Sequence, residues 1–271
     1  MRAGESSTPK ACVESRGKTR ADNDLRVVNQ QARGHHGRVG ERATLTIGVL
    51  VLWLIGYFGV GFCVDPSRAR ELGTTLDGRI PFVARSVWVY LGVFPASLLP
   101  LFVVRCPRLF RRATLSYAIA IAVSLIVFAA MPLTSTGFRI DRSGLDVARF
   151  SPWAVSVLYD LDPRFNLFPC LHLSIAVLAA WAAWTARRAY GAAAFAGVAL
   201  IAASILTVKQ HFVLDGVGGV ALAAIIHAVV LRRYRPTPGT DPAYGWRGPA
   251  AYAALLAVVY AGLYVGFRLV A

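Results

Sequence analysis

Residues 113–131 read ATLSYAIAIAVSLIVFAAM, an uncharged stretch that directly follows Arg111 and Arg112. A segment of about 20 apolar residues, when helical, is long enough to cross the hydrocarbon core of a bilayer. Six further apolar segments lie at about 43–64, 86–104, 171–186, 189–208, 216–231 and 250–267. Pro95 and Pro100 are expected to kink the segment 86–104. The sequence therefore predicts an all-α, polytopic transmembrane helix bundle of about six to seven spans.

The composition of the whole chain agrees with a membrane protein. Of its 271 residues, 56% are hydrophobic and only 16% are charged, which is too apolar for the surface of a soluble domain. A net charge of +15 would suggest nucleic acid as the partner of a soluble protein, but the basic residues lie mostly in the N-terminal tail and in short gaps between apolar segments. The expected partner is therefore the bilayer and not a nucleic acid.

Two domains are predicted. Residues 1–42 combine charged residues, Gly and Ser with few large apolar side chains, which is typical of a disordered basic tail and gives no apolar core for a cleaved signal peptide. Residues 43–271 form the transmembrane domain. The cysteines contain no C-x-x-C pair, which argues against a disulfide framework or a thiolate zinc site. They are Cys12, Cys63, Cys106 and Cys170.

The loops predict the orientation of the bundle. Three of them, around residues 105–112, 187–188 and 232–247, are rich in arginine, whereas 65–85 and 132–170 carry nearly balanced charges. Cytoplasmic loops are enriched in Lys and Arg. We therefore expect the N-terminus in the cytoplasm and the two balanced loops on the exoplasmic side of a membrane that we interpret as a bacterial inner membrane.

Two histidines are predicted to lie on this exoplasmic rim. His211 precedes Asp215 by four residues, a spacing that brings both side chains to one face of a helix, and His172 stands at the start of the segment 171–186. A carboxylate fixes the imidazole tautomer and makes the distal nitrogen more nucleophilic, and Lys209 supplies a cation for an anionic substrate. The set indicates acid–base chemistry on a phosphate, with a self-satisfied His–Asp pair as the alternative.

The same residues resemble the type 2 phosphatidic acid phosphatase family, which shares a site with the vanadium haloperoxidases. Its signature P-S-x-H is matched at residues 169–172, which read PCLH, and its signature S-R-x5-H-x3-D is matched by Ser204, His211 and Asp215. The sequence around Lys209 resembles the branch of inositol-phosphorylceramide and sphingomyelin synthases. The similarity covers roughly residues 110–232, with the motifs between 132 and 215.

Three positions depart from the family pattern. Cys170 replaces a phosphate-binding serine, and Ile205 replaces the arginine of the third signature. The first signature, K-x6-R-P, is reduced to a P-L-x5-R pattern that starts at Pro132 and ends at Arg139, with Arg142 as a rival for the same role. These departures keep open a catalytically silent protein that binds lipid phosphate.

The resemblance implies a lipid-phosphate phosphatase that uses a phosphohistidine and needs no metal or other cofactor. His211 would attack phosphorus, Asp215 would orient His211, and His172 would protonate the leaving oxygen. The phosphate oxygens would be held by Lys209, Arg139, Cys170 and Ser204.

Two alternatives remain beside the silent protein. An alcohol in place of water as acceptor would make the chain a phospholipid or sphingolipid head-group phosphotransferase. A metal site of His172, His211 and Asp215 is the other, and the nearby cations argue against it. The lipid, the acceptor and the oligomeric state stay open.

Overall fold

The computed structural model describes residues 40–235 and 244–270. The predicted disordered tail, 1–42, lies almost entirely outside the described residues. Contacts divide the chain into Met1–Thr44 and Leu45–Ala271, and apart from the first residues of one helix, Gly40–Thr44, the features described below lie in the second unit. Its described residues form helices and two isolated β-bridges without a strand, which confirms the all-α class.

The long apolar helices make the protein a multi-pass integral membrane protein. Within residues 40–235 and 244–270, five helices are long and apolar enough to cross a bilayer. The predicted segment 171–186 forms the shorter helix α8, Leu171–Ala186. The five are Gly40–Cys63, α6 (Pro107–Ala130), α9 (Arg188–Thr207), Val213–Leu231, in which α10 (Val213–Ile226) continues into the π-helix His227–Leu231, and α11 (Arg247–Val270).

The segment 86–104 is not one helix. It is divided into α3 (Val87–Leu91), α4 (Val93–Ala96) and α5 (Leu99–Val103). The N–H of Leu98 bonds to the carbonyl of Pro95 three residues back, at 3.0 Å, which tightens the turn between α4 and α5. Pro100 stands in the first turn of α5, where its missing N–H costs no hydrogen bond. The expected kinks are thus present as breaks.

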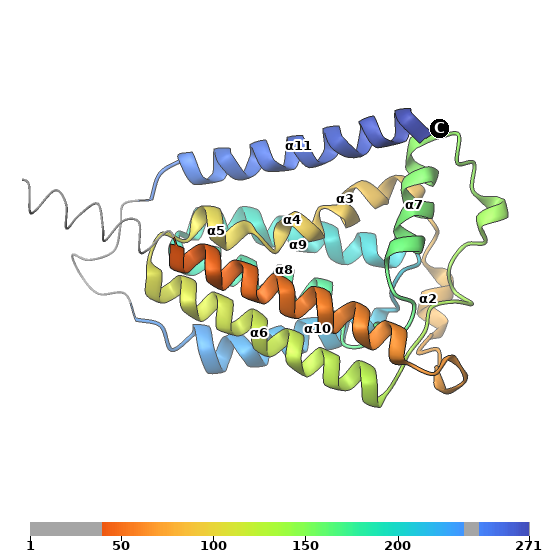
Figure 1. The fold of residues 1–271 in the computed structure, drawn as a ribbon, viewed down its shortest axis with the longest axis horizontal. Coiled ribbons are helices and arrows are strands. Elements are labelled where there is room, and N and C mark those ends of the chain that lie inside the picture. The colour runs from red at the N-terminus through yellow and green to blue at the C-terminus, as the bar shows by residue number, and fades with distance from the viewer. Residues whose placement is uncertain (1–39, 236–243, 271) are drawn as a thin grey trace, which may run out of the picture. The chain divides into compact units, whose positions relative to one another are not determined.

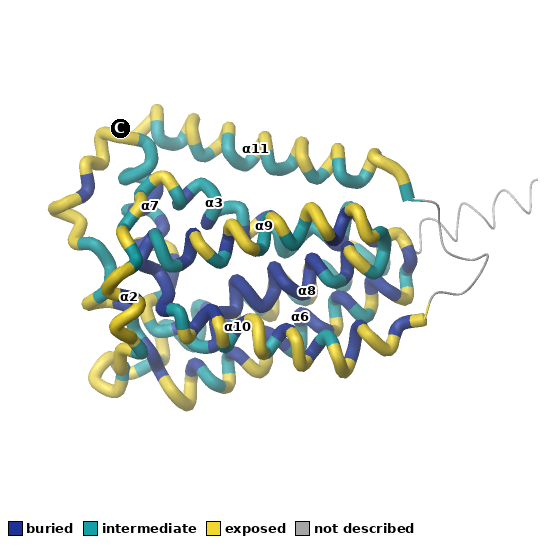
Figure 2. The backbone as a smooth tube through the Cα atoms, turned by 180° about the vertical axis from the view of Figure 1, so that it is seen from behind, coloured by how far each residue is buried: buried dark blue, intermediate teal, exposed yellow. Residues whose placement is uncertain are grey.

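Helix α8 forms the centre of the packed bundle. Twelve of its 16 residues are buried, so that apart from its C-terminal part it is dark blue in Figure 2. It packs against α4, α5, α6, α9 and α10. Its many alanines allow neighbouring helices to approach closely, as small residues do in membrane bundles. A helix buried on all sides fits the absence of an amphipathic pattern in its sequence.

The shorter elements gather at one end of the bundle. Figure 1 shows α7, Phe150–Leu161, crossing that end, with α2, Thr75–Arg79, beside it. The remaining short helices there are the 3-10 turns Pro66–Arg68, Ala84–Ser86 and Arg142–Gly144. Leu133 bridges both Arg70 and Asn166, so the loops 65–85 and 132–170 are joined to one another. Helices α8 and α10 begin at this end, which places their first residues under these loops.

Candidate active site

A sharp turn between α9 and α10 positions His211. The N–H of Gln210 donates to the carbonyl of Ile205 at 3.2 Å and that of Lys209 to the carbonyl of Leu206 at 3.1 Å, the pair of bonds that closes a Schellman motif. Lys209 has φ 58°, the left-handed conformation that glycine usually supplies at this position. His211 N–H also donates to the Ile205 carbonyl, at 3.1 Å, which holds His211 beneath the end of α9.

Asp215 lies in the first turn of α10 and faces His211. Its Oδ2 accepts a hydrogen bond from the Phe212 N–H at 2.8 Å and lies 3.6 Å from Nδ1 of His211. His211 precedes the helix, so the pair meets at a helix N-terminus and not along one helical face as the spacing predicts. Because Nδ1 faces the carboxylate, Nε2 points to the opposite side of the ring.

Cys170 and His172 begin α8 on the other side of the site. The N–H of Cys170 donates to the carbonyl of Asp215 at 3.0 Å, which joins the start of α8 to the start of α10. At Gly219 an added Cβ would lie 2.5 Å from the Cys170 carbonyl oxygen, so this close packing requires glycine. The Ser174 hydroxyl lies within hydrogen-bond distance of both carbonyls, Cys170 and Gly219, at 3.0 and 2.9 Å.

The side chains of Cys170, His172 and His211 form one buried cluster. The sulfur and one ring nitrogen of each histidine lie within 4.8 Å of one another, and the two imidazole centroids are 5.8 Å apart. Cys170 and His211 are at most 1% exposed, and His172 is 7% exposed. Among residues 40–235 and 244–270, no group forms a hydrogen bond with any of the four ring nitrogens. Buried polar atoms without partners indicate a place for a ligand.

The protonation of Cys170 and His211 is coupled. Burial raises the pKa of the Cys170 thiol, but the neighbouring imidazoles of His211 and His172 outweigh burial and lower this pKa to about 6. Burial lowers the pKa of His211, whereas Cys170 and Asp215 raise it to about 10. Both shifts favour a thiolate beside an imidazolium, because opposite charges attract strongly where little water screens them.

The residues expected to hold phosphate have other contacts in the structure. Lys209 Nζ donates to the carbonyl oxygens of Asp77, at 3.1 Å, and of Ile80, and lies 4.3 Å from the centre of the Phe138 ring. The hydroxyl of Ser204 donates to the carbonyl of Ile201 in its own helix, at 2.8 Å. Ser204 and Lys209 therefore lie in the same turn region as His211, with their donors directed to backbone carbonyls.

Arg139 is tied to the end of α7. Its Nη1 donates to the carbonyl of Tyr159 at 3.1 Å and its Nη2 to the carbonyl of Asp162 at 3.3 Å, and the guanidinium carbon lies 4.9 Å from the centre of the Tyr159 ring. Arg139 also lines a polar cavity of about 350 Å³ together with Arg142 and Arg164. Arg139 and Arg142, the two candidates for the arginine of the first signature, thus line the same cavity.

A family model described as the PAP2 superfamily matches residues 69–229, which include His172, His211 and Asp215. The chain belongs to the PAP2 superfamily. Comparison with curated proteins and with solved structures finds no match. Membership supports a phosphatase or phosphotransferase type of function and agrees with the family that the motifs resemble.

A buried carboxylate not predicted from the sequence lies next to the cluster of Cys170, His172 and His211. Asp162 Oδ1 accepts a hydrogen bond from the Tyr57 hydroxyl at 2.7 Å, and Oδ2 accepts from the Tyr90 hydroxyl at 3.0 Å and from Nε2 of Gln210. The rings of Tyr57 and Tyr90 each lie 5.8 Å from the His172 ring. No sequence spacing relates these residues, although Gln210 is adjacent to His211, so only the fold reveals that they surround His172.

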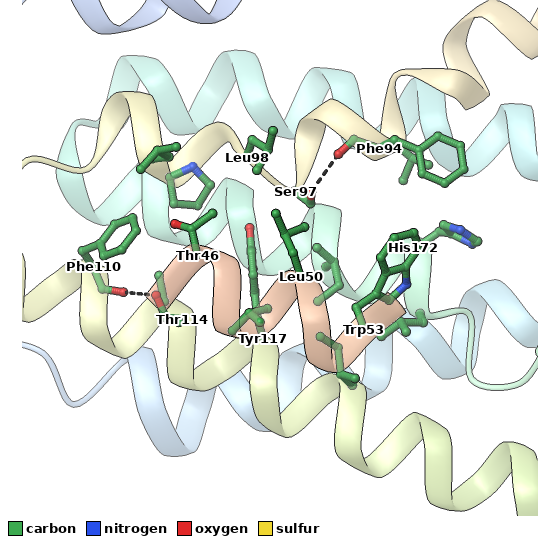
Figure 3. Close-up of a pocket in the computed structure, with 18 residues that line it drawn as sticks. Thr46, Leu50, Trp53, Phe94, Ser97, Leu98, Phe110, Thr114, Tyr117 and His172 are labelled. Atoms are coloured by element: carbon green, nitrogen blue, oxygen red, sulfur yellow. Dashed lines mark hydrogen bonds between the residues drawn. The ribbon is translucent and has the colours of Figure 1, made fainter. Parts of the chain in front are cut away.

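An apolar cavity ends at His172. It encloses about 230 Å³ and is lined by the helix Gly40–Cys63 together with α4, α5, α6 and α8. Figure 3 shows Leu50, Leu98 and Tyr117 along its walls, with His172 at one end. The cluster of Cys170, His172 and His211 thus continues into a space suited to hydrocarbon.

Proposed function

We propose that this PAP2 superfamily protein is a lipid-phosphate phosphatase that works through a phosphohistidine at His211. The observation that carries the proposal is the buried position of the His211 ring, with its Nδ1 3.6 Å from Asp215 and its centre 5.8 Å from that of His172. An imidazole with one edge at a carboxylate and the other facing a second imidazole has both a nucleophilic nitrogen and a proton donor nearby.

The proposed reaction has two steps. Nε2 of His211, once its proton has passed to the neighbouring Cys170 thiolate, forms a bond to phosphorus, the bond from phosphorus to the lipid oxygen breaks, and His172 donates a proton to that oxygen. Water then attacks the phosphohistidine, His172 takes a proton from the water, and inorganic phosphate leaves. Asp215 stabilises the positive charge that the His211 ring carries while the phosphoryl group is attached. No step uses a metal ion or another cofactor.

The helix ends support binding of the phosphate. Helices α8 and α10 both begin at the cluster, and helix N-termini favour anions through their free N–H groups and dipoles. Lys209, Arg139 and Ser204 are the proposed side-chain donors, and Cys170 joins them when its sulfur carries a proton. For Lys209 and Arg139, this role requires that substrate phosphate replace the backbone carbonyls that now accept from them. Each donor that binds the transition state would contribute about 3 kcal/mol.

The apolar cavity supports a lipid as the leaving group. In the proposed reaction, His172 protonates the oxygen of the departing lipid, and the cavity ends at His172, so the hydrocarbon chain of that lipid would extend into it. A lipid alcohol would fit the same space and could attack the phosphohistidine in place of water. Head-group phosphotransfer is therefore the second candidate. The orientation expected from the loop charges opens the site to the exoplasmic side.

The test is phosphate release from phosphatidic acid by the purified protein, with and without an added lipid alcohol. Release that does not need the alcohol supports the phosphatase, whereas transfer to the alcohol supports the second candidate. His211→Ala is expected to abolish both release and any acid-labile phosphoenzyme. His172→Ala should still form the phosphoenzyme from a substrate with a good leaving group, because such a group leaves without protonation.

His227→Ala is the matched control. His227 stacks on Trp181 with ring centres 4.2 Å apart, away from the cluster, so its removal should leave release unchanged. Phosphate release by His211→Ala at the wild-type rate, or a phosphoryl group trapped on His172, would contradict the proposal. Complete inactivity of the wild type on lipid phosphates would favour the silent lipid-phosphate-binding protein.

A further inference from the structure

The cysteine that replaces the serine of the PAP2 signature changes which ligands the cluster can hold. Cys170, His172 and His211 offer one sulfur and two imidazole nitrogens, the donor atoms that zinc prefers in proteins. A serine hydroxyl would not be a comparable ligand, because zinc binds neutral hydroxyl groups weakly. From the sequence, Asp215 and not Cys170 is the expected third ligand beside the two histidines, since Cys170 shares no recognised metal-binding spacing with them.

We infer that Cys170, His172 and His211 bind a thiophilic divalent cation, zinc foremost, at the position where the substrate phosphate would bind. The three donor atoms lie within 4.8 Å of one another. In a tetrahedral site, with bonds of about 2.0 Å to nitrogen and about 2.3 Å to sulfur, the donors would lie about 3.5 Å apart. The donor atoms would therefore have to move closer together by about 1 Å to complete the site.

The position of Asp215 supports the same site independently. Metal-bound histidines usually direct their second ring nitrogen to a carboxylate, which fixes the tautomer. Nδ1 of His211 lies 3.6 Å from Oδ2 of Asp215, so Nε2 of His211 is the nitrogen that would bind the ion. Both ring nitrogens of His172 lack hydrogen-bond partners among the described residues, so either of them is available to the ion.

The charges of the cluster also favour a cation. Zinc displaces to solvent the proton that Cys170 and His211 share, and the resulting thiolate together with the Asp215 carboxylate balances the two positive charges of the ion. The N-termini of α8 and α10, with roughly half a positive charge each, oppose the ion but are outweighed by two full negative charges. Lys209 and Arg139 are also cationic, but their side chains donate to backbone carbonyls and not to the cluster, so they are compatible with a bound cation.

Zinc bound here would occupy Nε2 of His211 and so block attack on phosphorus, an effect that rests on the proposed function. Zinc binding itself does not. Zinc would thus inhibit the protein at concentrations that the Cys170→Ser variant tolerates. This distinction separates the two proposals, because binding and inhibition are measured on the same samples.

The binding experiment uses full-length protein without a histidine tag. Cys12, Cys63, His35 and His36 are replaced by Ser or Gln to remove other ligands. Zinc is titrated against a competing indicator, and the metal content is measured after gel filtration. We expect about one zinc per chain. Because loss of a supporting residue already costs about 10- to 100-fold in metal affinity, loss of a ligand in Cys170→Ser should cost at least about tenfold.

Cobalt serves as the spectroscopic probe. Cobalt bound to a thiolate gives a charge-transfer band in the near ultraviolet, which Cys170→Ser should lose. His227→Gln, on the far part of the Val213–Leu231 helix, is the matched control and should bind as the background protein does. Equal zinc affinity in Cys170→Ser, or a metal content near zero in all samples, would overturn the inference.

An activity measurement on the same samples distinguishes the metal site from the proposed function. Zinc should inhibit phosphate release by the background protein at concentrations that match its binding, and at least about tenfold more zinc should be needed in Cys170→Ser. Zinc binding without any phosphate release overturns the proposed function and leaves the metal site standing. Phosphate release without zinc binding overturns the metal site and leaves the proposed function standing. Activation of phosphate release by zinc would contradict the expected inhibition.

Discussion

The thiol of Cys170 differs from the serine hydroxyl of the PAP2 signature in charge as well as in hydrogen bonding. A hydroxyl donates a hydrogen bond to a phosphate oxygen, whereas a thiol is a weak donor and a thiolate only accepts. The neighbouring imidazoles favour the thiolate by lowering the pKa of Cys170. A negative sulfur next to His211 therefore repels the substrate that the two histidines are proposed to bind.

Replacing this thiol tests the point directly. Cys170→Ser should raise kcat/KM for a lipid phosphate about tenfold, equivalent to about 1.4 kcal/mol of transition-state stabilisation, because a donor replaces a repelling anion. Cys63→Ser, which changes an exposed thiol outside the cluster, is the control and should have no effect. The measurement is steady-state phosphate release in the presence of a chelator. A fall in kcat/KM for Cys170→Ser would mean that the sulfur takes part in the reaction.

Residue spacing predicts part of this site. The i,i+4 relation of His211 and Asp215, and His172 at the start of an apolar segment, correctly indicate that the three come together. Spacing cannot indicate the hydrogen bonds of Asp162, because its partners Tyr57 and Tyr90 lie 105 and 72 residues away. Contacts over such distances depend on how the helices pack, which a local pattern does not contain.

At the scale of elements, the site depends on how α9 ends. Its Schellman turn directs the chain so that His211 lies 1% exposed below the helix end, yet the left-handed position is occupied by Lys209 and not by glycine. The backbone strain of this residue, about 1 kcal/mol, is offset by the contacts of its ammonium group with the carbonyls of Asp77 and Ile80. Lys209 therefore links the turn after α9 to the loop that contains α2.

Two variants separate the backbone from the side chain. Lys209→Ala and Lys209→Gly both remove the ammonium group, but only alanine keeps the strain at φ 58°. The glycine variant should be more stable than the alanine variant by about 1 kcal/mol. Thermal unfolding in detergent, followed by tryptophan fluorescence, measures the difference. Equal melting temperatures would show that the position is not left-handed in the folded protein. Phosphate release by Lys209→Gly reports whether the charge serves catalysis too.

Asp77 connects α2 to the start of α10. Its Oδ1 accepts from the Val213 N–H at 2.7 Å, and its Oδ2 accepts from the N–H of Thr74 at 2.7 Å and from its hydroxyl at 2.6 Å. Burial raises the pKa of Asp77, but the hydrogen bonds from Thr74 and Val213 outweigh burial and lower it. The carboxylate therefore holds the helix that carries Asp215 most firmly when it is ionised.

This lowered pKa predicts a pH dependence of stability. A folded-state pKa below the unfolded one contributes stability that is complete above the unfolded value, about 3.9 for an aspartate, and is lost as the pH falls through the folded value. Asp77→Asn should lower the melting temperature at pH 7, and its difference from wild type should shrink below about pH 4. Parallel curves for the two proteins from neutral to acidic pH would contradict this assignment. Asp146→Asn, on an exposed loop, serves as the control.

Local sequence signals account for the elements unevenly. The uncharged runs give the ends of the long helices to within six residues, since only a helix satisfies the backbone of an apolar segment in a bilayer. The break of 86–104 follows from Pro95 and Pro100. The short helices α2 and α7 are not predicted, because each is held by contacts with other parts of the chain, such as those of Asp77 and Arg139.

At the scale of the whole molecule, we expect the arginine-rich loops and the loops over the site on opposite sides of the membrane. Lys and Arg favour the cytoplasmic side, so the loop around Arg108 should be cytoplasmic and the loop around Asp146 exoplasmic. In a background with all four cysteines changed to serine, Asp146→Cys should react with a membrane-impermeant thiol reagent in intact cells. Arg108→Cys should react only after lysis. The opposite labelling would place the site on the cytoplasmic side.

The apolar cavity connects the bundle as a whole to the choice of substrate. Leu50 lines it from the helix Gly40–Cys63 and is 38% exposed, so a larger side chain can be accepted there without disrupting a packed core. Leu50→Trp should fill part of the space and raise KM for a long-chain phosphatidic acid about fivefold, a cost of about 1 kcal/mol, with little change in kcat.

A short-chain, water-soluble phosphate that does not enter the cavity should be turned over as in wild type. Ile55→Trp adds the same ring to the same helix at a site that is 69% exposed and outside the cavity, so it should leave both substrates unaffected. Equal effects of the two tryptophans, or an equal loss for short and long chains, would mean that the cavity serves packing and that the lipid chain binds elsewhere.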